Sequence, residues 1–456
     1  MKLPDTSDTI VAQATPPGAG ALAIVRLSGP SAFAAAAGFL APAPRAPEHA
    51  RASLLSVRDS GKLVDRVVAV FFKAPASYTG EDSVEITCHG SPYIIRAILN
   101  LAVKAGARPA APGEFTLRAF LNGKLDLAQA EAVGQLIEAS SSLAHRAAIT
   151  QAEGLLSGKV RGIREELVKL LAQIEARLDD SYEETPPLNA AGFLRRVRRA
   201  ERAARALSGQ YEAGRGIRDG LKAVIAGAPN SGKSSLLNAL LGYDRAIVTP
   251  AAGTTRDTLE AGTEIDGFRV IFTDTAGFSS RPASPAEREG ILRAEAALAA
   301  ADAVLLVKDS SVKESREDRA AEEKVKALAQ PAARVLRVYG KSDLPRLRRP
   351  PAGTFPVSAK NGAGLPRLKA ALVREQKKVF GDGAQAVVTS ARHFEALAGA
   401  AGELAALGGL LAGGETRLEL AAEHLRGASD SLASILGETV PEEVLAGIFS
   451  SFCFGK

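Results

Sequence analysis

A glycine-rich segment in the middle of the chain has the residue types and spacing that hold phosphate groups. It runs Gly227-Ala-Pro-Asn-Ser-Gly232-Lys233-Ser234 and matches the pattern G-x-x-x-x-G-K-[ST]. Its glycines let backbone N–H groups wrap a β-phosphate, Lys233 reaches the β- and γ-phosphate oxygens, and the Ser234 hydroxyl ligates Mg²⁺. A predicted buried strand over 223–226 and a predicted helix after the loop supply the required context. A simple glycine turn between strand and helix is the alternative, and that context disfavours it.

Two later segments are typical of the nucleotide switches of a GTPase. The first, GTTRD, covers 253–257, about 20 residues after the loop, where a threonine closes over Mg²⁺ and the γ-phosphate. The second, FRVIFTDTAG, covers 268–277 and predicts a strand that ends in D-x-x-G. In that pattern Asp274 holds the Mg²⁺ shell and the Gly277 N–H senses the γ-phosphate.

The base is indicated by Gly340-Lys341-Ser342-Asp343, which follows the strand-like run ARVLRVY. This segment is similar to the guanine-reading pattern N-K-x-D, in which the carboxylate accepts from the base N1–H and N2–H₂. The later Ser358-Ala359-Lys360 supplies the usual second guanine contact. An adenine-binding protein has no need of this carboxylate, so the sequence predicts GTP rather than ATP.

Two positions depart from the usual patterns. Gly340 stands where asparagine normally bonds the base and braces the phosphate loop, and losing such a contact costs about 0.5–1.5 kcal/mol. We therefore expect weaker nucleotide binding or relaxed base selectivity. Phe278 stands where small signalling GTPases have a water-orienting glutamine. Water positioning, and the charge that an arginine finger usually supplies, must then come from elsewhere.

Composition places the chain among globular proteins of two to four domains, since it has 456 residues, 46% of them hydrophobic and 24% charged. Its two cysteines, Cys88 and Cys453, are far apart, which excludes a disulfide framework and fits a reducing cytoplasm. The N-terminus lacks the pattern of a secretory signal, and no run reaches the ~18 uncharged apolar residues of a membrane span. We expect a cytoplasmic protein without a membrane partner. The net charge of +6 is only a weak indication of an anionic partner.

Periodicity divides the chain into regions. Short strand-like runs up to about 118 predict a mixed α/β domain, and helical periodicity follows over 120–182, with an arginine-rich helix over 191–214. Alternating strand and helix signals from 221 to about 378 predict a doubly wound parallel sheet, and helical periodicity returns over 390–437. Because both helical regions are amphipathic and need a partner, we expect one helical domain with the α/β domain inserted into it. The predicted divisions are 1–118, 119–217, 218–379 and 380–456.

Four segments, in order, resemble one family. They are DTIVAQATPPGAGALAIVRLSG (8–29), YTGEDSVEITCHGSP (78–92), RPAAPGEFTLRAFLNGKLDLAQAEAV (108–133) and GIFSSFCFGK (447–456), the last with Phe454 where isoleucine is usual. Together with the nucleotide motifs they are similar to the tRNA-modification GTPases of the MnmE family, also called TrmE. The resemblance covers nearly the whole chain.

The resemblance implies a multidomain α/β fold. It comprises an N-terminal α+β folate-binding and dimerisation domain related to tetrahydrofolate-dependent aminomethyltransferases, a helical-bundle domain, and an inserted Ras-like P-loop GTPase domain with a doubly wound, mostly parallel sheet. It also implies a homodimer whose GTPase domains meet face to face in the GTP state. Potassium at that interface then replaces the arginine finger.

The resemblance extends the set of site residues. Catalysis is assigned to Lys233, to Cys453 and to Glu287. Glu287 would orient the attacking water, with Glu289 as the alternative. Potassium is assigned to Asn230, Thr249, Ala251 and Thr254, and magnesium to Ser234 and Thr255. The full set assigned to GTP is Asn230, Ser231, Gly232, Lys233, Ser234, Ser235, Thr249, Gly253, Thr254, Thr255, Asp274, Thr275, Ala276, Gly277, Lys341, Asp343, Ser358, Ala359 and Lys360.

A second site is implied for a tetrahydrofolate derivative, either 5,10-methylene or 5-formyl. Arg26, Glu85 and Lys124 match the family's folate-contacting positions, and the terminal Lys456 folds back to the same cavity. A carboxylate suits the amidine-like edge of a pterin, and cations suit the glutamate tail. Cys453 matches a tail cysteine near the modification centre, although a cysteine between two phenylalanines is more often a buried apolar residue.

In the family, a flavin-dependent partner, MnmG (GidA), forms a heterotetramer or larger complex with this protein. Together they place an aminomethyl or carboxymethylaminomethyl group on C5 of the wobble uridine of certain tRNAs. One predicted helix and one predicted loop carry arginines that could bind tRNA. The alternative, that these arginines only form a solvated surface, is at least as good an interpretation. The helix carries Arg195, Arg196, Arg198, Arg199, Arg202 and Arg205, and the loop carries Arg346, Arg348 and Arg349. Two rival functions are a ribosome-assembly GTPase and a folate-dependent one-carbon transferase with a regulatory nucleotide domain.

Overall fold

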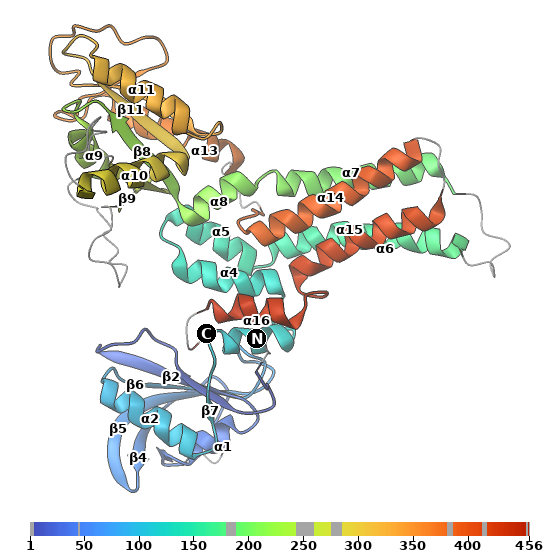
Figure 1. The fold of residues 1–456 in the computed structure, drawn as a ribbon. Helices are drawn as coiled ribbons and strands as arrows, with labels where there is room; N and C mark the ends of the chain where they lie inside the picture. The colour runs from blue at the N-terminus through green and yellow to red at the C-terminus, as the bar shows by residue number, and fades with distance from the viewer. Residues whose placement is uncertain are drawn as a thin grey trace. The chain divides into compact units, whose positions relative to one another are not determined.

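The computed structural model describes residues 4–43, 46–178, 188–242, 260–274, 285–380, 386–412, 417–452 and 455 (Figure 1), without the side chains of 260, 274, 285–290 and 379–380. The chain folds into two compact units. The first comprises 1–137, 151–205 and 395–456, and the second comprises 138–150 and 206–394. Each unit is therefore built from segments that are distant in the sequence.

The first unit contains a seven-stranded sheet of order β3-β4-β5-β6-β2-β1-β7, antiparallel except for the β1–β7 pair. Alternate residues of the strands, such as Val25, Leu27 and Ile86, are buried against α2, where Ile95 and Ile98 meet them. This period of two is what the alternating sequence predicts. The bounds are β1 Ile10–Gln13, β2 Leu22–Ser28, α1 Ala32–Ala37, β3 Leu40–Ala41, β4 Ala52–Asp59, β5 Lys62–Phe72, β6 Ser83–His89, α2 Pro92–Lys104 and β7 Arg108–Pro109.

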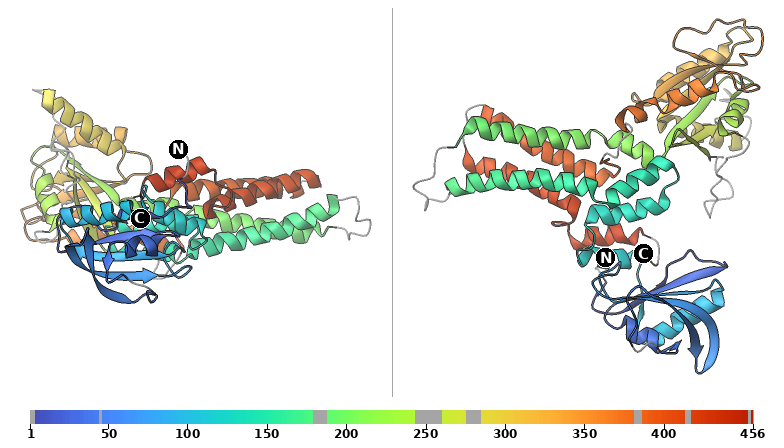
Figure 2. Two further views of the ribbon diagram at one scale, coloured as in Figure 1. Left: turned by 90° about the horizontal axis from the view of Figure 1, so that it is seen from below. Right: turned by 180° about the vertical axis from the view of Figure 1, so that it is seen from behind.

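The helical part of the chain consists of nine helices among the described residues. In both figures α6, α7, α14 and α15 run side by side as a long bundle (Figures 1 and 2). Leu167, Leu170 and Ile174 of α6 are fully buried, as are Leu425 and Leu432 of α15. The bounds are α3 Glu114–Leu121, α4 Leu127–Glu138, α5 Ser142–Ala152, α6 Leu155–Leu178, α7 Ala190–Ser208, α8 Tyr211–Asp219, α14 Ala391–Ala412, α15 Leu418–Leu436 and α16 Glu442–Ser450.

One of these helices, α14, is long and apolar enough to cross a membrane by length and composition alone. Leu397, Ala400, Leu404 and Leu407 at helical spacing are all fully buried within the protein. Packing of one apolar face therefore accounts for its hydropathy.

The second unit is built on a six-stranded sheet of order β13-β12-β11-β8-β10-β9, parallel except for the β9–β10 hairpin. Residues of β8 alternate between two cores: Ala223 and Ile225 pack with α9, whereas Val224 and Ala226 pack with α11. A sheet buried on both faces is the doubly wound arrangement. The bounds are β8 Leu221–Gly227, α9 Lys233–Leu241, β9 Glu260–Ile265, β10 Phe268–Asp274, α10 Pro285–Ala299, β11 Ala303–Asp309, α11 Arg316–Leu328, β12 Arg334–Gly340, β13 Phe355–Pro356, α12 Leu365–Leu372 and α13 Arg374–Phe380.

The predicted multidomain α/β fold class is confirmed, with an N-terminal mixed sheet, a helical part and an inserted P-loop domain. The exact boundaries 1–118, 119–217, 218–379 and 380–456 stay a prediction. Helix lengths differ from the periodicity. The region 120–182 divides into α3 to α6, and the expected helix over 191–214 divides into α7 and α8 around Gly209. Gly154, at φ +83° between α5 and α6, adopts a backbone conformation that ends a helix.

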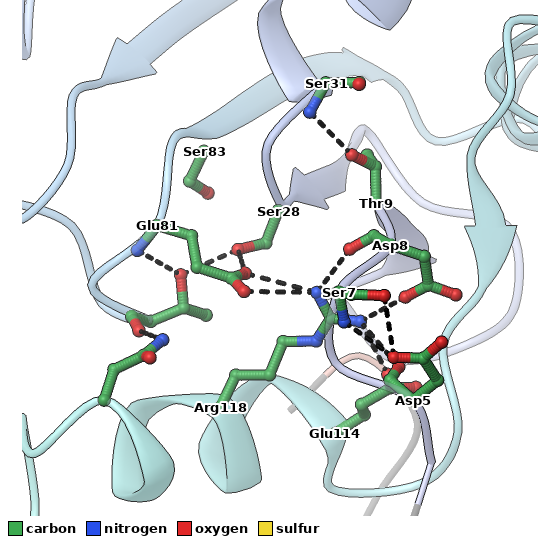
Figure 3. Close-up of polar contacts among 12 residues, drawn as sticks. Asp5, Ser7, Asp8, Thr9, Ser28, Ser31, Glu81, Ser83, Glu114 and Arg118 are labelled. Carbon is green, nitrogen blue, oxygen red and sulfur yellow. Dashed lines mark hydrogen bonds and ion pairs between the residues drawn. The ribbon is translucent and has the colours of Figure 1, made fainter.

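A buried ionic cluster fixes the N-terminal segment of the first unit (Figure 3). Arg118 of α3 is fully buried, and its Nη2 donates to Asp8 Oδ1 at 2.6 Å and to Glu114 Oε1 at 2.9 Å. Its Nη1 donates to the Asp8 carbonyl at 2.6 Å and pairs with Glu81 at 3.2 Å. Glu114 also accepts from Arg108 at 2.7 Å. The cluster therefore joins the chain start, the loop before β6 and α3.

Replacing Arg118 with methionine should destabilise the first unit by about 3 kcal/mol, because the buried Glu114 and the partly buried Asp8 and Glu81 lose the cation that joins them. Hydrogen exchange of the β2 and β6 amides measures the local free energy of opening. The exposed Arg51–Glu48 pair provides the control, and Arg51→Met should leave that free energy almost unchanged. Equal effects of both variants would contradict the structural role of the cluster.

The same cluster should lose stability in acid. The pKa of Asp8 is held below its usual value chiefly by its hydrogen bond from Arg108, which outweighs the opposing effect of burial. A carboxylate whose folded-state pKa is lowered stabilises the fold above its unfolded-state pKa, and this stabilisation disappears as the pH falls through the folded-state pKa.

Candidate nucleotide-binding site

The loop between β8 and α9 has a backbone that only glycine adopts easily at its two ends. Gly227 has φ +154°, and a Cβ there would lie 2.3 Å from the Val307 carbonyl oxygen of β11. Gly232, at φ +95°, begins α9 in the left-handed region. Asn230 is left-handed as well, at φ +59°, which asparagine tolerates better than most residues. The glycines of the motif are thus required by close approach to the neighbouring strand and by backbone angle.

Two polar side chains of this loop, those of Lys233 and Ser231, are buried. Lys233 is buried, and its Nζ donates to the Gly227 and Ala228 carbonyls at 3.1 and 2.8 Å, so the cation lies folded into the loop. The Ser231 hydroxyl is buried, and no protein atom among the described residues accepts from it or donates to it. Buried hydroxyls are normally bonded, so a phosphate-bearing ligand fits this orphaned group.

A cavity of about 320 Å³ opens beside the loop, at the carboxyl ends of β8, β11 and β12. Its lining includes seven residues that the sequence assigns to GTP, namely Ser231, Gly232, Ser235, Lys341, Asp343, Ala359 and Lys360. Leu236, Val307, Val338, Leu344 and Val357 add apolar surface. A mostly apolar cavity with a few convergent polar groups suits a planar base.

Asp343 offers an ionised carboxylate to this cavity. The buried Ser358 hydroxyl donates to Asp343 Oδ1 at 2.6 Å. That bond, assisted by a backbone hydrogen bond, lowers the pKa of Asp343. An ionised carboxylate only accepts hydrogen bonds, so it complements the two adjacent donors of guanine, a pair that adenine does not have. Ser358 therefore orients the carboxylate rather than lining the cavity itself.

Lys341 links the base-reading segment to the phosphate loop. It has φ +55°, and its Nζ donates to Asp309 Oδ2 at 2.6 Å and to the Asn230 carbonyl at 3.2 Å. Burial opposes ionisation of Asp309, but the bonds from Lys341 and Ser311 prevail and lower its pKa. Lys341, held by Asp309, thus connects residues 340–343 to the phosphate loop.

Asp309 and Ser310 were missed by the sequence motifs. Asp309 ends β11 and is the register partner of Gly340 in β12, and the Ser310 hydroxyl donates to the Gly340 carbonyl at 2.7 Å. The available signal was an acidic residue at the carboxyl end of a buried strand, VLLVKDSS, because such ends line the sites of parallel sheets.

Many residues assigned to the nucleotide lie outside the described residues: Thr249, Ala251, Gly253, Thr254, Thr255, Thr275, Ala276 and Gly277. The backbone of Asp274 ends β10, in register with Ile225 of β8, and Glu287 and Glu289 belong to α10. Ser234 lies in the first turn of α9 and is exposed. The magnesium, potassium and water-orienting roles of these residues stay predictions.

The first unit brings two residues of the predicted folate site together. Arg26 of β2 and Glu85 of β6 are register partners, and the guanidinium donates through Nε and Nη2 to Glu85 Oε1 at 2.9 and 2.7 Å. Both side chains are partly exposed, at 21% and 28%. The guanidinium also lies 5.7 Å from the Tyr78 ring centroid and 5.6 Å from that of Phe115. Tyr78 and Phe115 were missed by the sequence analysis.

One further predicted folate residue is described, and two positions at the chain end are not. Lys124 Nζ donates to the Pro75 carbonyl at 3.0 Å, in the loop that carries Tyr78. Lys456 and Cys453 lie outside the described residues. Gly455 is described, at φ +86°, and a Cβ there would lie 2.0 Å from the Gln13 carbonyl. Gly455 therefore lies against the end of β1 in the same sheet.

A phosphate loop with a buried lysine, beside a cavity that carries an ionised carboxylate, is the arrangement of a P-loop GTPase. Family models described as "GTP-binding protein TrmE N-terminus" and "MnmE helical domain" match residues 9–124 and 127–453, respectively. The chain belongs to the MnmE (TrmE) family of tRNA-modification GTPases, as similar relatives also show.

A tRNA modification GTPase MnmE from Thermus thermophilus is 44% identical over 452 residues, covering 98% of this chain and 99% of the relative. That of Xanthomonas campestris pv. campestris is 42% identical over 456 residues, with 98% and 99% covered. Among solved structures, the G domain of the T. maritima FeoB iron transporter is 26% identical, covering 34% of this chain and 97% of its own, with a TM-score of 0.26. That score is too low for the structural likeness to add to the argument.

Restoring the usual asparagine at position 340 should tighten GDP binding about 2- to 10-fold, equivalent to one hydrogen bond of about 0.5–1.5 kcal/mol. A Cβ on Gly340 would lie 3.4 Å from the Ser231 carbonyl and 3.7 Å from Val307, which is ordinary van der Waals contact. Calorimetric titration with GDP and with xanthosine diphosphate measures affinity and selectivity. Gly340→Ala is the control for packing alone, and GDP binding by Gly340→Asn no tighter than by Gly340→Ala would contradict the missing-bond interpretation.

Proposed function

We propose that this GTPase modifies C5 of the wobble uridine of certain tRNAs with a flavin-dependent partner of the MnmG class. The group added is aminomethyl or carboxymethylaminomethyl, and its carbon comes from a tetrahydrofolate derivative, 5,10-methylene or 5-formyl. The observation that carries the proposal is the presence of two separate sites in one chain, the nucleotide cavity at Asp343 and the Arg26–Glu85 pair. The full-length likeness to tRNA modification GTPases supports it.

The nucleotide part of the proposal assigns roles to the described residues. Asp343 accepts from the guanine N1–H and N2–H₂, Lys341 braces the phosphate loop, and Lys233 moves from its carbonyl contacts to the β- and γ-phosphates. Mg²⁺ supplies charge compensation for those phosphates and would be held by Ser234 with Thr255. The orphaned Ser231 hydroxyl supports a ligand with several oxygens at this loop.

Hydrolysis is proposed to depend on potassium and on pairing of two nucleotide domains in a homodimer. Phe278 leaves the loop without a water-orienting glutamine, and this role is given to Glu287. A monovalent cation offsets charge that builds on phosphate oxygens. Asn230 supports such a site, because its side chain is exposed on the phosphate loop and carries an amide oxygen that can ligate a cation. Thr249, Ala251 and Thr254 would complete the ligand set.

The folate part of the proposal uses the partly exposed ion pair on the first unit's sheet. Glu85 offers its second carboxylate oxygen to the amidine-like edge of a pterin, and the partly exposed Tyr78 offers ring surface beside Arg26. Phe115, which is fully buried, packs behind the Arg26 guanidinium. Lys124 and Lys456 meet the glutamate tail. Cys453 is given a part in the chemistry. The contact of Gly455 with Gln13 supports a tail that runs toward this sheet.

The two rival functions differ in what they require of the chain. A ribosome-assembly GTPase would carry an RNA-binding KH-like domain or a second phosphate loop, and the match of residues 9–124 to the TrmE N-terminus model disfavours it. A one-carbon transferase with a merely regulatory nucleotide domain would modify tRNA without turnover. Deleting residues 218–379 tests this second rival, because a transferase whose nucleotide domain is only regulatory would keep its folate-dependent transfer to tRNA. We place the protein in the cytoplasm, where tRNA is available.

Exchanging KCl for NaCl should slow GTP hydrolysis by at least about 10-fold, because one stabilising cation is lost from the transition state. Asn230→Gly keeps the left-handed backbone and removes the proposed ligand, so its rate should no longer depend on the salt. Phosphate release at equal ionic strength measures both rates, and GDP affinity is the control for loop integrity. A wild-type rate that is indifferent to the cation would refute the potassium assignment.

Glu85→Gln should weaken binding of 5-formyltetrahydrofolate about 10- to 100-fold, because a charge-assisted hydrogen bond contributes about 1.5–3 kcal/mol. tRNA modification with the flavin partner should fall in parallel, while GTP hydrolysis stays unchanged. Calorimetry measures folate affinity, and nucleoside analysis of the tRNA measures modification. Glu48→Gln, an exposed carboxylate in the same unit, is the matched control. Unchanged folate affinity in Glu85→Gln would remove Glu85 from the site.

A further inference from the structure

Helix α7 carries an unusual concentration of positive charge. Its 19 residues, AAGFLRRVRRAERAARALS, include six arginines and one glutamate. The apolar positions Phe193, Val197, Ala200, Ala204 and Leu207 are buried and form one face at helical spacing. The opposite face is therefore rich in guanidinium groups.

Only part of this charge is neutralised within the protein. Arg196 pairs with Glu166 of α6 at 2.6 Å, and Arg205 pairs with Glu201 at 2.8 Å. Across the described ranges, none of the other four arginines of α7 has a carboxylate within ion-pair distance. These four are exposed and occupy positions i, i+3, i+4 and i+7 of one face, and we call them the arginine stripe: Arg195, Arg198, Arg199 and Arg202.

The stripe begins at a hollow in the protein surface. A cavity of about 450 Å³ is lined by Gln173, Asn189, Gly192, Phe193, Arg195, Arg196 and Arg199. Three guanidinium groups and two side-chain amides thus converge on one space, and the Asn189 Oδ1 is already used to accept the Gly192 N–H at 2.9 Å. The groups left facing the cavity are chiefly donors, so its occupant must supply several acceptor oxygens.

We propose that the arginine stripe and this cavity bind the sugar-phosphate backbone of RNA. The proposal rests on the tRNA substrate of the proposed function and names where that substrate touches this chain. Arg195 and Arg202 are separated by about 10 Å along the helix axis. That length matches about three successive phosphates of one strand. Guanidinium forks bind phosphate in a bidentate way, which a lysine cannot reproduce.

The composition of the stripe selects backbone contact over other partners. No aromatic side chain lies among the four arginines, so the stripe lacks the aromatic platforms on which bases stack, and contacts to the backbone are independent of sequence. Nor does α7 expose a large hydrophobic residue among those the structure describes, which a membrane-surface helix needs. An acidic face of a partner protein is the remaining competitor, and the experiment below separates it.

The test compares two double variants with equal loss of charge. Arg195→Gln/Arg199→Gln removes two stripe arginines that line the cavity. Arg205→Gln/Arg426→Gln removes two exposed arginines of the same unit that already have carboxylate partners, Glu201 and Glu175. Glutamine keeps helix propensity, and melting curves confirm folding. Affinity of the full chain for tRNA, and for an unrelated RNA hairpin, is measured by anisotropy over a range of KCl concentrations.

The stripe variant should bind both RNAs at least about 10-fold more weakly at low salt. The slope of the logarithm of its association constant against log[salt] should become less steep by about 2, the value for two lost phosphate contacts. The control should change affinity less than about 3-fold, with the slope retained. GTP hydrolysis should be equal in all three proteins.

Each other outcome is decisive. Equal affinity and slope in wild type and stripe variant overturn the inference, as does a wild type that binds neither RNA. Loss of flavin-partner binding with RNA affinity intact makes the stripe a protein interface and also overturns it. A further outcome combines the expected slope change in the stripe variant with a wild-type protein that modifies no tRNA. That outcome supports the inference and refutes the proposed function, so the two failures are distinguishable.

Discussion

A cation that is removed from water must be surrounded by oxygen atoms, and this requirement organises both units of the chain. In the first unit, Arg118 is fully buried and gathers Asp8, Glu81 and Glu114 from three separate segments. In the second unit, Lys233 is buried among the carbonyls of its own loop, and Lys341 reaches both Asp309 and the Asn230 carbonyl. The first cluster is structural, whereas the second leaves the Ser231 hydroxyl unsatisfied among the described residues.

What the sequence predicts well in this chain is chemistry that is local. The phosphate loop is contiguous, and its glycines are required by backbone angle or by one neighbouring strand, so its pattern alone located β8, the loop and α9. Asp309 could not be located in this way. Its contact with Lys341 depends on the register of β11 with β12, which places Asp309 opposite Gly340, and no spacing within the sequence encodes that pairing. The glycine at position 340 was visible in the sequence, but the bonds of Lys341 to Asp309 and to the Asn230 carbonyl were not.

The N-terminal site shows the same limit more sharply. Arg26 and Glu85 are 59 positions apart in the sequence. Only the family resemblance predicted them in one site, and the β2–β6 register then shows that they are neighbours. Tyr78 could not be predicted as a neighbour of Arg26, because the conformation of its loop brings the two side chains together and the sequence does not specify that conformation. Helix lengths were overestimated for a related reason: apolar periodicity continues across Gly154 and Gly209, although the backbone ends a helix at or near each of them. Periodicity reports which face is buried, and not where the hydrogen-bond ladder stops.

The insertion of the nucleotide domain has a structural consequence at α5. Residues 138–150 belong to the second unit, although they lie between α4 and α6 in the sequence. Ser142 donates to Glu264 at 2.9 Å, Arg269 donates to Ser140 at 2.9 Å, and the Leu143 N–H donates to the Gly267 carbonyl at 3.2 Å. These contacts tie α5 to the β9–β10 hairpin, whose last residue is the Asp274 of the D-x-x-G motif. Because these contacts hold α5 against the hairpin, α5 packs as part of the nucleotide-binding unit, although the chain continues from it directly into α6 of the first unit.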